Sequence, residues 1–288
     1  MLLTRQKILL YYLWLSGGTL NHLRLLKSCF LSKNESLNIQ KTSFYDFLPY
    51  HYGPFSFQLY HDVNLMINSG EVLNKDKIHW QLTSQGIISA KLIPSKIKED
   101  LARLHFKYKG ISDNELINLA YQQYPWYAIN SKLLNQPIIE KPIADKQVYT
   151  MGYEGSSIDA FLNKLMLSGI ERLIDVRNNP ISRRYGFHKS TLSNLCKKLD
   201  IEYYHFPELG IPSSFRQNLD NWDDYQILFN KYEKEVLPKT KDSIDQIAFL
   251  MKEKTSTLLC MESNPEYCHR LRLARVLSQQ MKLSIINL

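Results

Sequence analysis

The second half of the chain alternates short apolar runs with stretches whose apolar residues recur at helical spacing. The apolar runs predict β-strands over Gln147–Gly152, Arg172–Val176, Ile201–Phe206, Thr257–Met261 and Leu283–Asn287. The stretches between and after them predict helices over Ser157–Ser168, Lys189–Leu199, Trp222–Val236, Ser243–Lys252 and Glu266–Gln280. This alternation is typical of an α/β fold with a mainly parallel sheet. We therefore expect an α/β C-terminal domain over residues 146–288.

The hydrophobic pattern of the first half predicts mainly helices, with two short strands late in the segment. Periodic apolar residues predict helices over Arg5–Leu15, Leu20–Phe30 and Ser56–Ser69, then short strands over Glu71–Leu73 and Ile78–Leu82, then a helix over Ser84–Leu92 that Thr83 caps. Three helices, a two-stranded wing and a further helix follow one another in the order of a winged-helix domain, a relative of the helix-turn-helix. We expect such a helix-rich domain over residues 1–95.

Residues 96–145 are expected to form a helical connector and linker. Helices are predicted over Ile97–Tyr108 and Asp113–Tyr124, and Ser112 with Glu115 three residues later has the pattern of a capping box. Pro137 and Pro142 lie in the expected linker, residues 131–145.

Composition places the chain among globular proteins. Of its 288 residues, 44% are hydrophobic and 22% are charged, which excludes disordered and fibrous classes. Four cysteines are too few for a disulfide framework. Arg5 and Lys7 interrupt the apolar start, so it does not read as a signal peptide, and no stretch has the roughly 18 apolar residues of a membrane span. The sequence predicts a soluble, cytoplasmic protein without a membrane partner.

The positive charge is concentrated in the first half. The chain has a formal net charge of +8, and residues 1–150 carry 17 Lys and Arg against 11 Asp and Glu. A basic surface attracts phosphate backbones, so DNA, other nucleic acid or a nucleotide is the expected partner. The expected recognition helix, Ser56–Ser69, has no Lys or Arg, and the nearby positive charges are Lys75, Lys77, Lys91, Lys96 and Lys98. A winged helix that docks on protein, or a purely structural domain, therefore remains an alternative.

Polar residues follow the predicted strands of the second half, where parallel sheets bind ligands beyond the carboxyl ends of their strands. Four arginines lie in or near these loops, and we expect them, with Asp175, to bind an anionic ligand: Arg177, Arg183, Arg184 and Arg270. Guanidinium groups bind phosphate or carboxylate in a bidentate manner. The alternative is that Asp175 and Glu262 pair with them inside the fold.

Catalytic residues cannot be assigned from the pattern alone, and four possibilities stay open. Cys260 or Cys268 could act as a nucleophile with His269 as base, or be an ordinary buried thiol. The two cysteines, His269 and His205 could hold a metal, although no C-x₂-C pair supports this, and we predict no metal. The carboxylates of Glu154, Glu208 and Glu262 could hold Mg²⁺ for phosphodiester hydrolysis, without a compact acidic motif to support it. No glycine-rich phosphate loop is present, and the sequence does not identify a cofactor.

Four motifs of the second half, GYEG, IDVRNNPISRR, YYHFPELG and LLCMESNPEYCHR, resemble domain-of-unknown-function family 488 in order and spacing. The resemblance runs from Gln147 to the C-terminus and implies a compact α/β domain. It also implies an accessory role in prokaryotic genome defence or DNA modification, with nucleic acid or a nucleotide as ligand.

The stretch Tyr52-Gly53-Pro54 with the helix and turn after it resembles the winged-helix portion of Panacea-type, antitoxin-like domains. We therefore expect a nucleic-acid-associated accessory protein that recognises a phosphate-bearing ligand, such as a nucleotide, nucleic acid or modified base, at the arginine cluster. The alternatives are a hydrolytic enzyme acting on a nucleotide or nucleic acid at the same site, and a protein-binding regulator.

Overall fold

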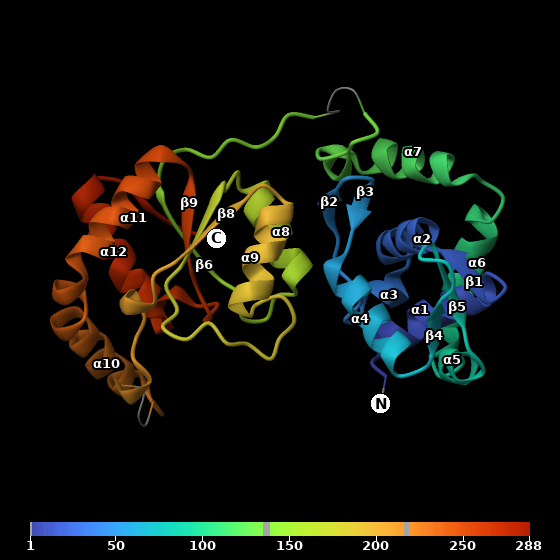
Figure 1. Ribbon diagram of the computed structural model, residues 1–288, viewed down its shortest axis with the longest axis horizontal. Helices are drawn as coiled ribbons and strands as arrows, with labels where there is room; N and C mark the ends of the chain where they lie inside the picture. The colour runs from blue at the N-terminus through green and yellow to red at the C-terminus, as the bar shows by residue number, and fades with distance from the viewer. Residues whose placement is uncertain (1, 135–138, 216–218) are drawn as a thin grey trace. The chain divides into compact units, whose positions relative to one another are not determined.

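The computed structural model describes residues 2–134, 139–215 and 219–288, and the chain divides into two compact units, Met1–Glu140 and Lys141–Leu288 (Figure 1). Pro137 of the expected linker lies outside the described residues. Each unit has a hydrophobic core of its own. Within the described ranges, no helix is both long enough and apolar enough to cross a membrane.

The N-terminal unit combines helices with two small antiparallel sheets. Its elements are α1 (Thr4–Leu15), β1 (Thr19–Asn21), α2 (His22–Glu35), α3 (Leu37–Gln40), β2 (Leu48–Tyr50), β3 (Gly53–Phe55), α4 (Phe57–Asn68), β4 (Val72–Asn74), β5 (His79–Leu82), α5 (Ser84–Ala90), α6 (Ser95–Tyr108), α7 (Asp113–Gln123) and the 3₁₀ turn η1 (Pro125–Ala128). Strands β1, β5 and β4 form a three-stranded antiparallel sheet in that order, and β2 pairs with β3 in a separate hairpin.

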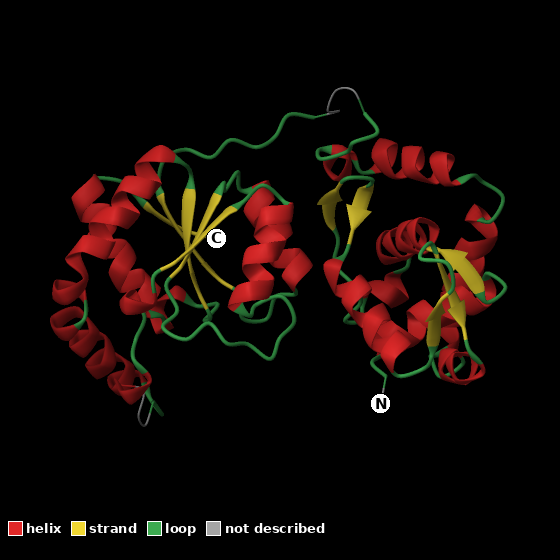
Figure 2. Cartoon of the chain, in the orientation of Figure 1, coloured by secondary structure: helices red, strands yellow, loops and turns green. Residues whose placement is uncertain are grey.

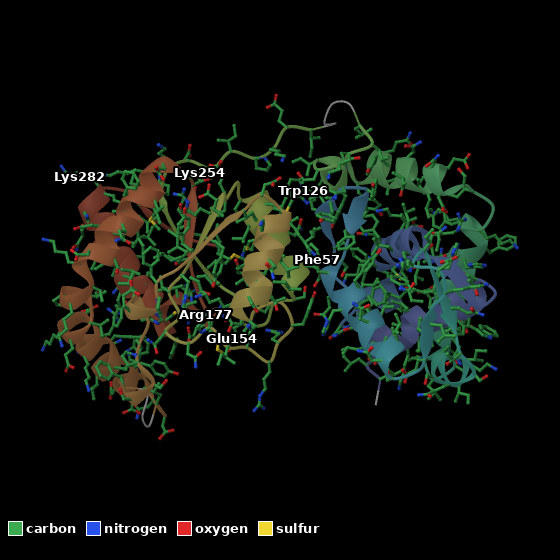
Figure 3. All side chains as sticks on the ribbon, in the orientation of Figure 1. Phe57, Trp126, Glu154, Arg177, Lys254 and Lys282 are labelled. Atoms are coloured by element: carbon green, nitrogen blue, oxygen red, sulfur yellow. The ribbon has the colours of Figure 1, made fainter. Side chains whose placement is uncertain are left out.

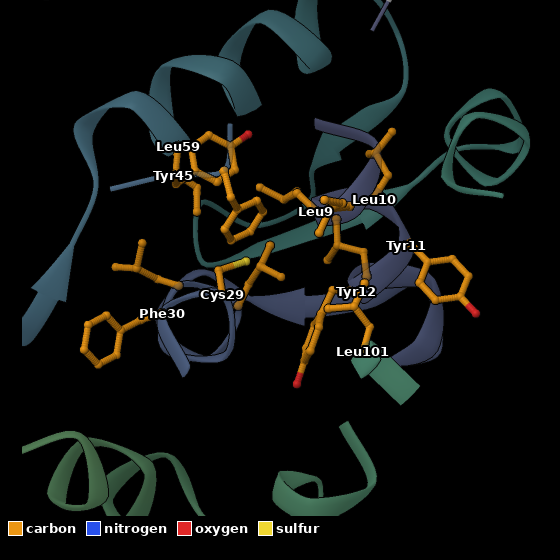
Figure 4. Close-up of a cluster of buried hydrophobic side chains, with 14 of the residues drawn as sticks. Leu9, Leu10, Tyr11, Tyr12, Cys29, Phe30, Tyr45, Leu59 and Leu101 are labelled. Atoms are coloured by element: carbon orange, nitrogen blue, oxygen red, sulfur yellow. The ribbon is translucent and has the colours of Figure 1, made fainter. Parts of the chain in front are cut away.

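Helix α1 lies at the centre of the N-terminal core because it is apolar around most of its circumference. Figure 4 shows Leu9, Leu10 and Tyr12 of α1 among side chains that include Leu59 of α4 and Leu101 of α6. Helix α6, which the sequence placed in a connector, therefore contributes to this core.

Two predicted helix caps of this unit are confirmed. The Thr83 hydroxyl accepts a hydrogen bond from the Gly86 backbone N–H at 3.1 Å at the start of α5. At the start of α7, the Ser112 hydroxyl accepts from the Glu115 N–H at 3.2 Å, and the Glu115 carboxylate accepts from the Ser112 N–H at 2.7 Å. These bonds satisfy N–H groups that a helix cannot pair internally.

The C-terminal unit alternates strands and helices around one parallel sheet. Its elements are β6 (Val148–Gly152), α8 (Ile158–Leu167), β7 (Arg172–Asp175), α9 (Lys189–Lys198), β8 (Glu202–His205), η2 (Pro207–Leu209), η3 (Ser213–Phe215), α10 (Trp222–Glu235), η4 (Leu237–Thr240), α11 (Lys241–Glu253), β9 (Ser256–Cys260), η5 (Pro265–Tyr267), α12 (His269–Met281) and β10 (Ile285–Asn287). The strands lie in the order β10–β6–β9–β7–β8, and every neighbouring pair is parallel. The predicted α/β domain with a mainly parallel sheet is confirmed.

The connections of this sheet run in opposite directions from β6 and β9. Helix α8 carries the chain from β6 past β9 to β7, whereas α12 carries it from β9 past β6 to β10. Helices α8 and α9 consequently cover one face, and α10, α11 and α12 cover the other (Figure 1 and Figure 2). Open parallel sheets bind ligands where the connections diverge in this way, at the carboxyl ends of the two strands.

Candidate functional site at the carboxyl edge of the parallel sheet

The loops that leave β6, β7 and β9 carry most of the predicted site residues to one edge of the sheet. Figure 3 shows Arg177 and Glu154 at one end of the C-terminal sheet and Lys254, which precedes β9, at the other. The side chains at this carboxyl edge form three groups: a buried ion pair, a guanidinium that holds a loop, and a cluster of thiol, imidazole and carboxylate groups.

The buried ion pair joins Asp175, the last residue of β7, to Arg177. Asp175 Oδ1 accepts from Arg177 Nε at 2.8 Å, and Oδ2 accepts from Nη2 at 2.5 Å. The Tyr203 hydroxyl donates to Asp175 Oδ2 at 2.6 Å. The remaining Arg177 nitrogen, Nη1, donates to the Phe187 carbonyl at 2.9 Å and to the Tyr153 hydroxyl at 3.3 Å.

Electrostatics explain why Arg177 keeps its charge inside the protein. Burial alone would lower the pKa of Arg177, but the hydrogen bonds and charge of Asp175 outweigh burial and raise it. Burial, followed by the charge of Asp175, raises the pKa of Tyr203, so this phenol stays protonated and donates. Arg177 is only 5% exposed. The structure thus places Arg177 in the internal pairing that the sequence left as the alternative to ligand binding.

Arg270 of α12 is also buried, and it binds main-chain oxygens. Its Nη1 donates to the Glu262 carbonyl, Nη2 donates to the Ser263 carbonyl at 3.1 Å, and Nε donates to Thr150 Oγ1 at 3.4 Å. The alternative to ligand binding paired the arginines with the Asp175 and Glu262 carboxylates, whereas the Arg270 guanidinium reaches the main chain of Glu262. The loop fits closely against β6, since a Cβ added at Gly152 would lie 1.8 Å from the Glu262 carbonyl oxygen. Arg270 therefore fixes the loop after β9.

Arg183 and Arg184 are the exposed members of the predicted arginine cluster. Arg184 Nη1 lies 3.5 Å from the Tyr153 carbonyl oxygen. The neighbouring Glu154 carboxylate accepts from the backbone N–H and the hydroxyl of Ser263, both at 3.1 Å. These hydrogen bonds, with a smaller contribution from the charge of Arg184, lower the pKa of Glu154. The exposed rim of the edge therefore carries both signs of charge.

The third group brings Cys260, Cys268 and His269 together. Cys260 ends β9, Cys268 immediately precedes α12, and His269 is the first residue of that helix. One ligand atom from each of the three lies within 4.8 Å of the other two, and all three residues are buried. Cys260 Sγ lies 3.8 Å from His269 Nδ1 and 3.2 Å from Glu262 Oε2.

The members of this cluster set one another's charge. A hydrogen bond from Cys268 and the charge of His269 outweigh burial and hold the pKa of Cys260 well below its usual range. Burial and the neighbouring Cys260 hold the pKa of Cys268 well above its usual range. Burial would lower the pKa of His269, but Cys260 raises it, and burial with Cys260 raises the pKa of Glu262. The arrangement favours a Cys260 thiolate beside a protonated His269.

Two further predicted residues have other partners. Glu208 is exposed, and its carboxylate accepts from the Ser243 hydroxyl at 2.5 Å. His205 Nε2 lies 2.9 Å from the Arg177 carbonyl oxygen, and His205 Nδ1 lies 2.9 Å from Lys189 Nζ. Neither side chain belongs to the thiol–imidazole cluster as the structure describes it.

Sequence reasoning missed the groups that hold these residues in place. Tyr153 and Tyr203 orient the ion pair, while Thr150 and Ser263 anchor Arg270 and Glu154. Tyrosine and threonine recur throughout the chain, so only their position at strand ends, on either side of the charged loops, could have drawn attention to them.

A cavity of about 530 Å³ lies in the N-terminal unit, separate from this edge. Its walls come from α2, the β2–β3 hairpin, Tyr60 of α4 and the turn before β5. Lys27 of α2 lines it, is 1% exposed, and donates to the Pro54 carbonyl at 2.8 Å. Burial lowers the pKa of Lys27 to about 7.

The fold and the edge described above define an α/β protein with a buried polar site at the carboxyl ends of a parallel sheet. A family model described as "Domain of unknown function DUF488" matches residues 157–277, from Ser157 at the start of α8 to Leu277 of α12. The predicted resemblance of the C-terminal half is confirmed over this range. No curated protein and no solved structure matches the chain.

Proposed function

We propose that this protein is a nucleic-acid-associated accessory protein that docks on duplex DNA through a winged-helix N-terminal unit. The observation that carries the proposal is the element order α1–β1–α2–α4–β4–β5, with β1, β5 and β4 side by side in an antiparallel sheet. A winged helix has this order of helices and strands, and α3 with the β2–β3 hairpin is an insertion before its third helix.

The charges favour contacts to phosphates over contacts to bases. Helix α4 carries no Lys or Arg, and its Asp62 is paired with Arg5 at 2.7 Å. Lys75 and Lys77 are exposed in the turn between β4 and β5, which is the tip of the wing. Phosphate contacts position a protein on DNA without reading its sequence. The proposed mode is therefore sequence-tolerant docking that depends on the wing.

The C-terminal unit is proposed to recognise a phosphate-bearing ligand at the carboxyl edge of its sheet. Because Arg177 and Arg270 have partners inside the protein, the accessible Arg183 and Arg184 are the groups proposed to meet the phosphate. The resemblances noted in the sequence favour a role in genome defence or DNA modification.

A second candidate function is an enzyme acting on a nucleotide or nucleic acid at the same edge. It is favoured by Cys260, Glu262 and His269, which together offer a nucleophile, a carboxylate and an imidazole within one buried cluster.

Binding of a fluorescently labelled duplex, measured by anisotropy at several salt concentrations, tests the docking proposal. Each phosphate contact contributes a slope of about −0.9 to the logarithmic salt dependence, so the double variant Lys75→Glu/Lys77→Glu should weaken binding and reduce the slope by about 2. Lys239→Glu/Lys241→Glu makes the same charge change at exposed positions of the other unit and is the matched control. Equal losses in both double variants, or no binding by the unmodified chain at low salt, would overturn the proposal.

A further inference from the structure

The thiol–imidazole cluster has the chemistry and the spacing of a zinc site. The cysteines of the chain are free, so Cys260 and Cys268 approach each other without forming a disulfide. Zinc binds thiolate sulfur at about 2.3 Å and imidazole nitrogen at about 2.0–2.1 Å in a tetrahedron, which separates a sulfur and a nitrogen ligand by roughly 3.6 Å. The distance from Cys260 Sγ to His269 Nδ1 is 3.8 Å.

The orientation of His269 supports metal binding through one defined nitrogen. Its Nε2 lies 3.1 Å from the Val176 carbonyl oxygen, which only accepts, so Nε2 carries a proton in both the neutral and the protonated ring. In the neutral ring, the lone pair of Nδ1 then points toward Cys260. A zinc-binding histidine is usually held by such a bond from its other ring nitrogen to a backbone carbonyl or carboxylate. Tyr232 packs edge-on against the imidazole with ring centroids 5.3 Å apart and restricts its rotation.

Glu262 supplies a fourth ligand from the loop that joins Cys260 to Cys268. Its Oε2 lies 3.2 Å from Cys260 Sγ, and the side chain is half-buried. Arg270 holds the carbonyl oxygens of Glu262 and Ser263, so the loop is fixed before any ion arrives. The donor set of two sulfurs, one nitrogen and one carboxylate oxygen suits zinc, whereas magnesium and calcium prefer oxygen ligands alone.

We propose that Cys260, Cys268, His269 and Glu262 bind one zinc ion at the carboxyl edge of the sheet. Binding displaces the proton of the Cys268 thiol and the Nδ1 proton of His269, and places the metal among two thiolates, a neutral imidazole and a carboxylate. The loop of residues 261–267 and the start of α12 are then joined to β9 through the ion. This site goes beyond the proposed docking on DNA, which uses the other unit.

The test measures metal content on the full chain. The protein is stripped with a chelator, dialysed, incubated with zinc chloride, freed of loose metal, and analysed by atomic emission spectrometry. The unmodified chain should retain one zinc per molecule, and Cys260→Ser and His269→Gln should lose most of it. Cys196→Ser is the matched control, because Cys196 is a fully buried thiol of α9 in the same unit.

Cobalt provides a second readout that folding defects alone do not mimic. The cobalt-loaded chain should show the near-ultraviolet sulfur-to-metal charge-transfer absorption that thiolate ligands give, and Cys196→Ser should retain it. If Cys260→Ser fails to fold, Glu262→Gln serves as the second variant because it keeps both thiols. Its zinc affinity, measured in competition with a chelator, should fall at least 10- to 100-fold, roughly the loss seen when a residue that only supports a metal ligand is removed.

Two results would overturn the zinc site. One is that a correctly folded unmodified chain retains no zinc, and that iodoacetamide alkylates its Cys260 at the same rate with and without zinc. The other is equal zinc retention in every variant. Anisotropy with duplex DNA on the same variants separates this proposal from docking, because loss of zinc should leave DNA affinity unchanged.

Discussion

Replacing Arg177 by methionine should destabilise the C-terminal unit strongly, because it leaves the Asp175 carboxylate buried without its counter-ion. Asp175 has no exposed surface and would keep only the Tyr203 hydroxyl and the Arg177 backbone N–H, which donates at 3.1 Å. Removing one partner of a buried ion pair typically costs about 3–5 kcal/mol. For a unit of this size, the loss corresponds to a fall in melting temperature on the order of 10 °C.

Two companion variants distinguish pairing from the mere loss of a large side chain. Arg184→Met removes an exposed arginine of the same loop and should change the free energy of unfolding by no more than about 0.5 kcal/mol. The double variant Asp175→Asn/Arg177→Met removes both charges and should be more stable than Arg177→Met alone, since no unpaired carboxylate remains.

The assay must report on the C-terminal unit alone, because the two units need not unfold together. Hydrogen exchange followed by mass spectrometry, read on peptides from β7 and β9 of the full chain, gives the free energy of opening of the sheet. An Arg177→Met chain whose sheet is as protected as that of Arg184→Met would refute the internal role of Arg177. A phosphate-bearing ligand that stabilises the unmodified chain but not Arg177→Met would also refute it.

Further predictions concern buried groups elsewhere. Burial lowers the pKa of Lys27 from 10.5 to about 7. Between these two pH values Lys27 binds fewer protons in the folded protein than in the unfolded protein, so the free energy of unfolding should rise with pH. Relative to Lys27→Met, the gain between about pH 7 and about pH 10 should be about 3.5 kcal/mol, and urea unfolding at these two pH values checks it; a difference independent of pH would contradict it. Gly152→Ala should cost roughly 1–3 kcal/mol in thermal melts, since its Cβ would meet the Glu262 carbonyl at 1.8 Å, and an unchanged melting temperature would refute the close packing. Thr83→Ala should cost about 1 kcal/mol, checked by hydrogen exchange in α5, whereas Thr83→Ser should cost less.

The strands and their common edge could be predicted because local sequence determines them. Each strand of the parallel sheet is a short apolar run between polar loops, and its predicted ends agree with the structure to within two residues. Helix α12 begins three residues later than predicted, at His269, because Pro265 starts a separate 3₁₀ turn and Cys268 is extended. Strands β1, β2 and β3 have three residues each, too few to show a periodic pattern.

The direction of the charged side chains could not be predicted, because it depends on tertiary partners. Position along the chain places Arg177 and Arg270 at the correct edge. It does not reveal that Arg177 turns back to Asp175, or that Arg270 reaches main-chain carbonyls of its own loop. The same limit applies to Glu208, which follows β8 but bonds to Ser243 of α11.

Cross-linking tests the central proposal, docking on DNA through the N-terminal unit, most directly. A duplex carrying photoreactive bromodeoxyuridine is irradiated with the full chain at low salt, and the attached peptides are identified by mass spectrometry. We expect cross-links in residues 57–98, which span α4, the wing with Lys75 and Lys77, and the start of α6. Cross-links confined to residues 141–288, or none when the duplex is in large excess, would contradict the account.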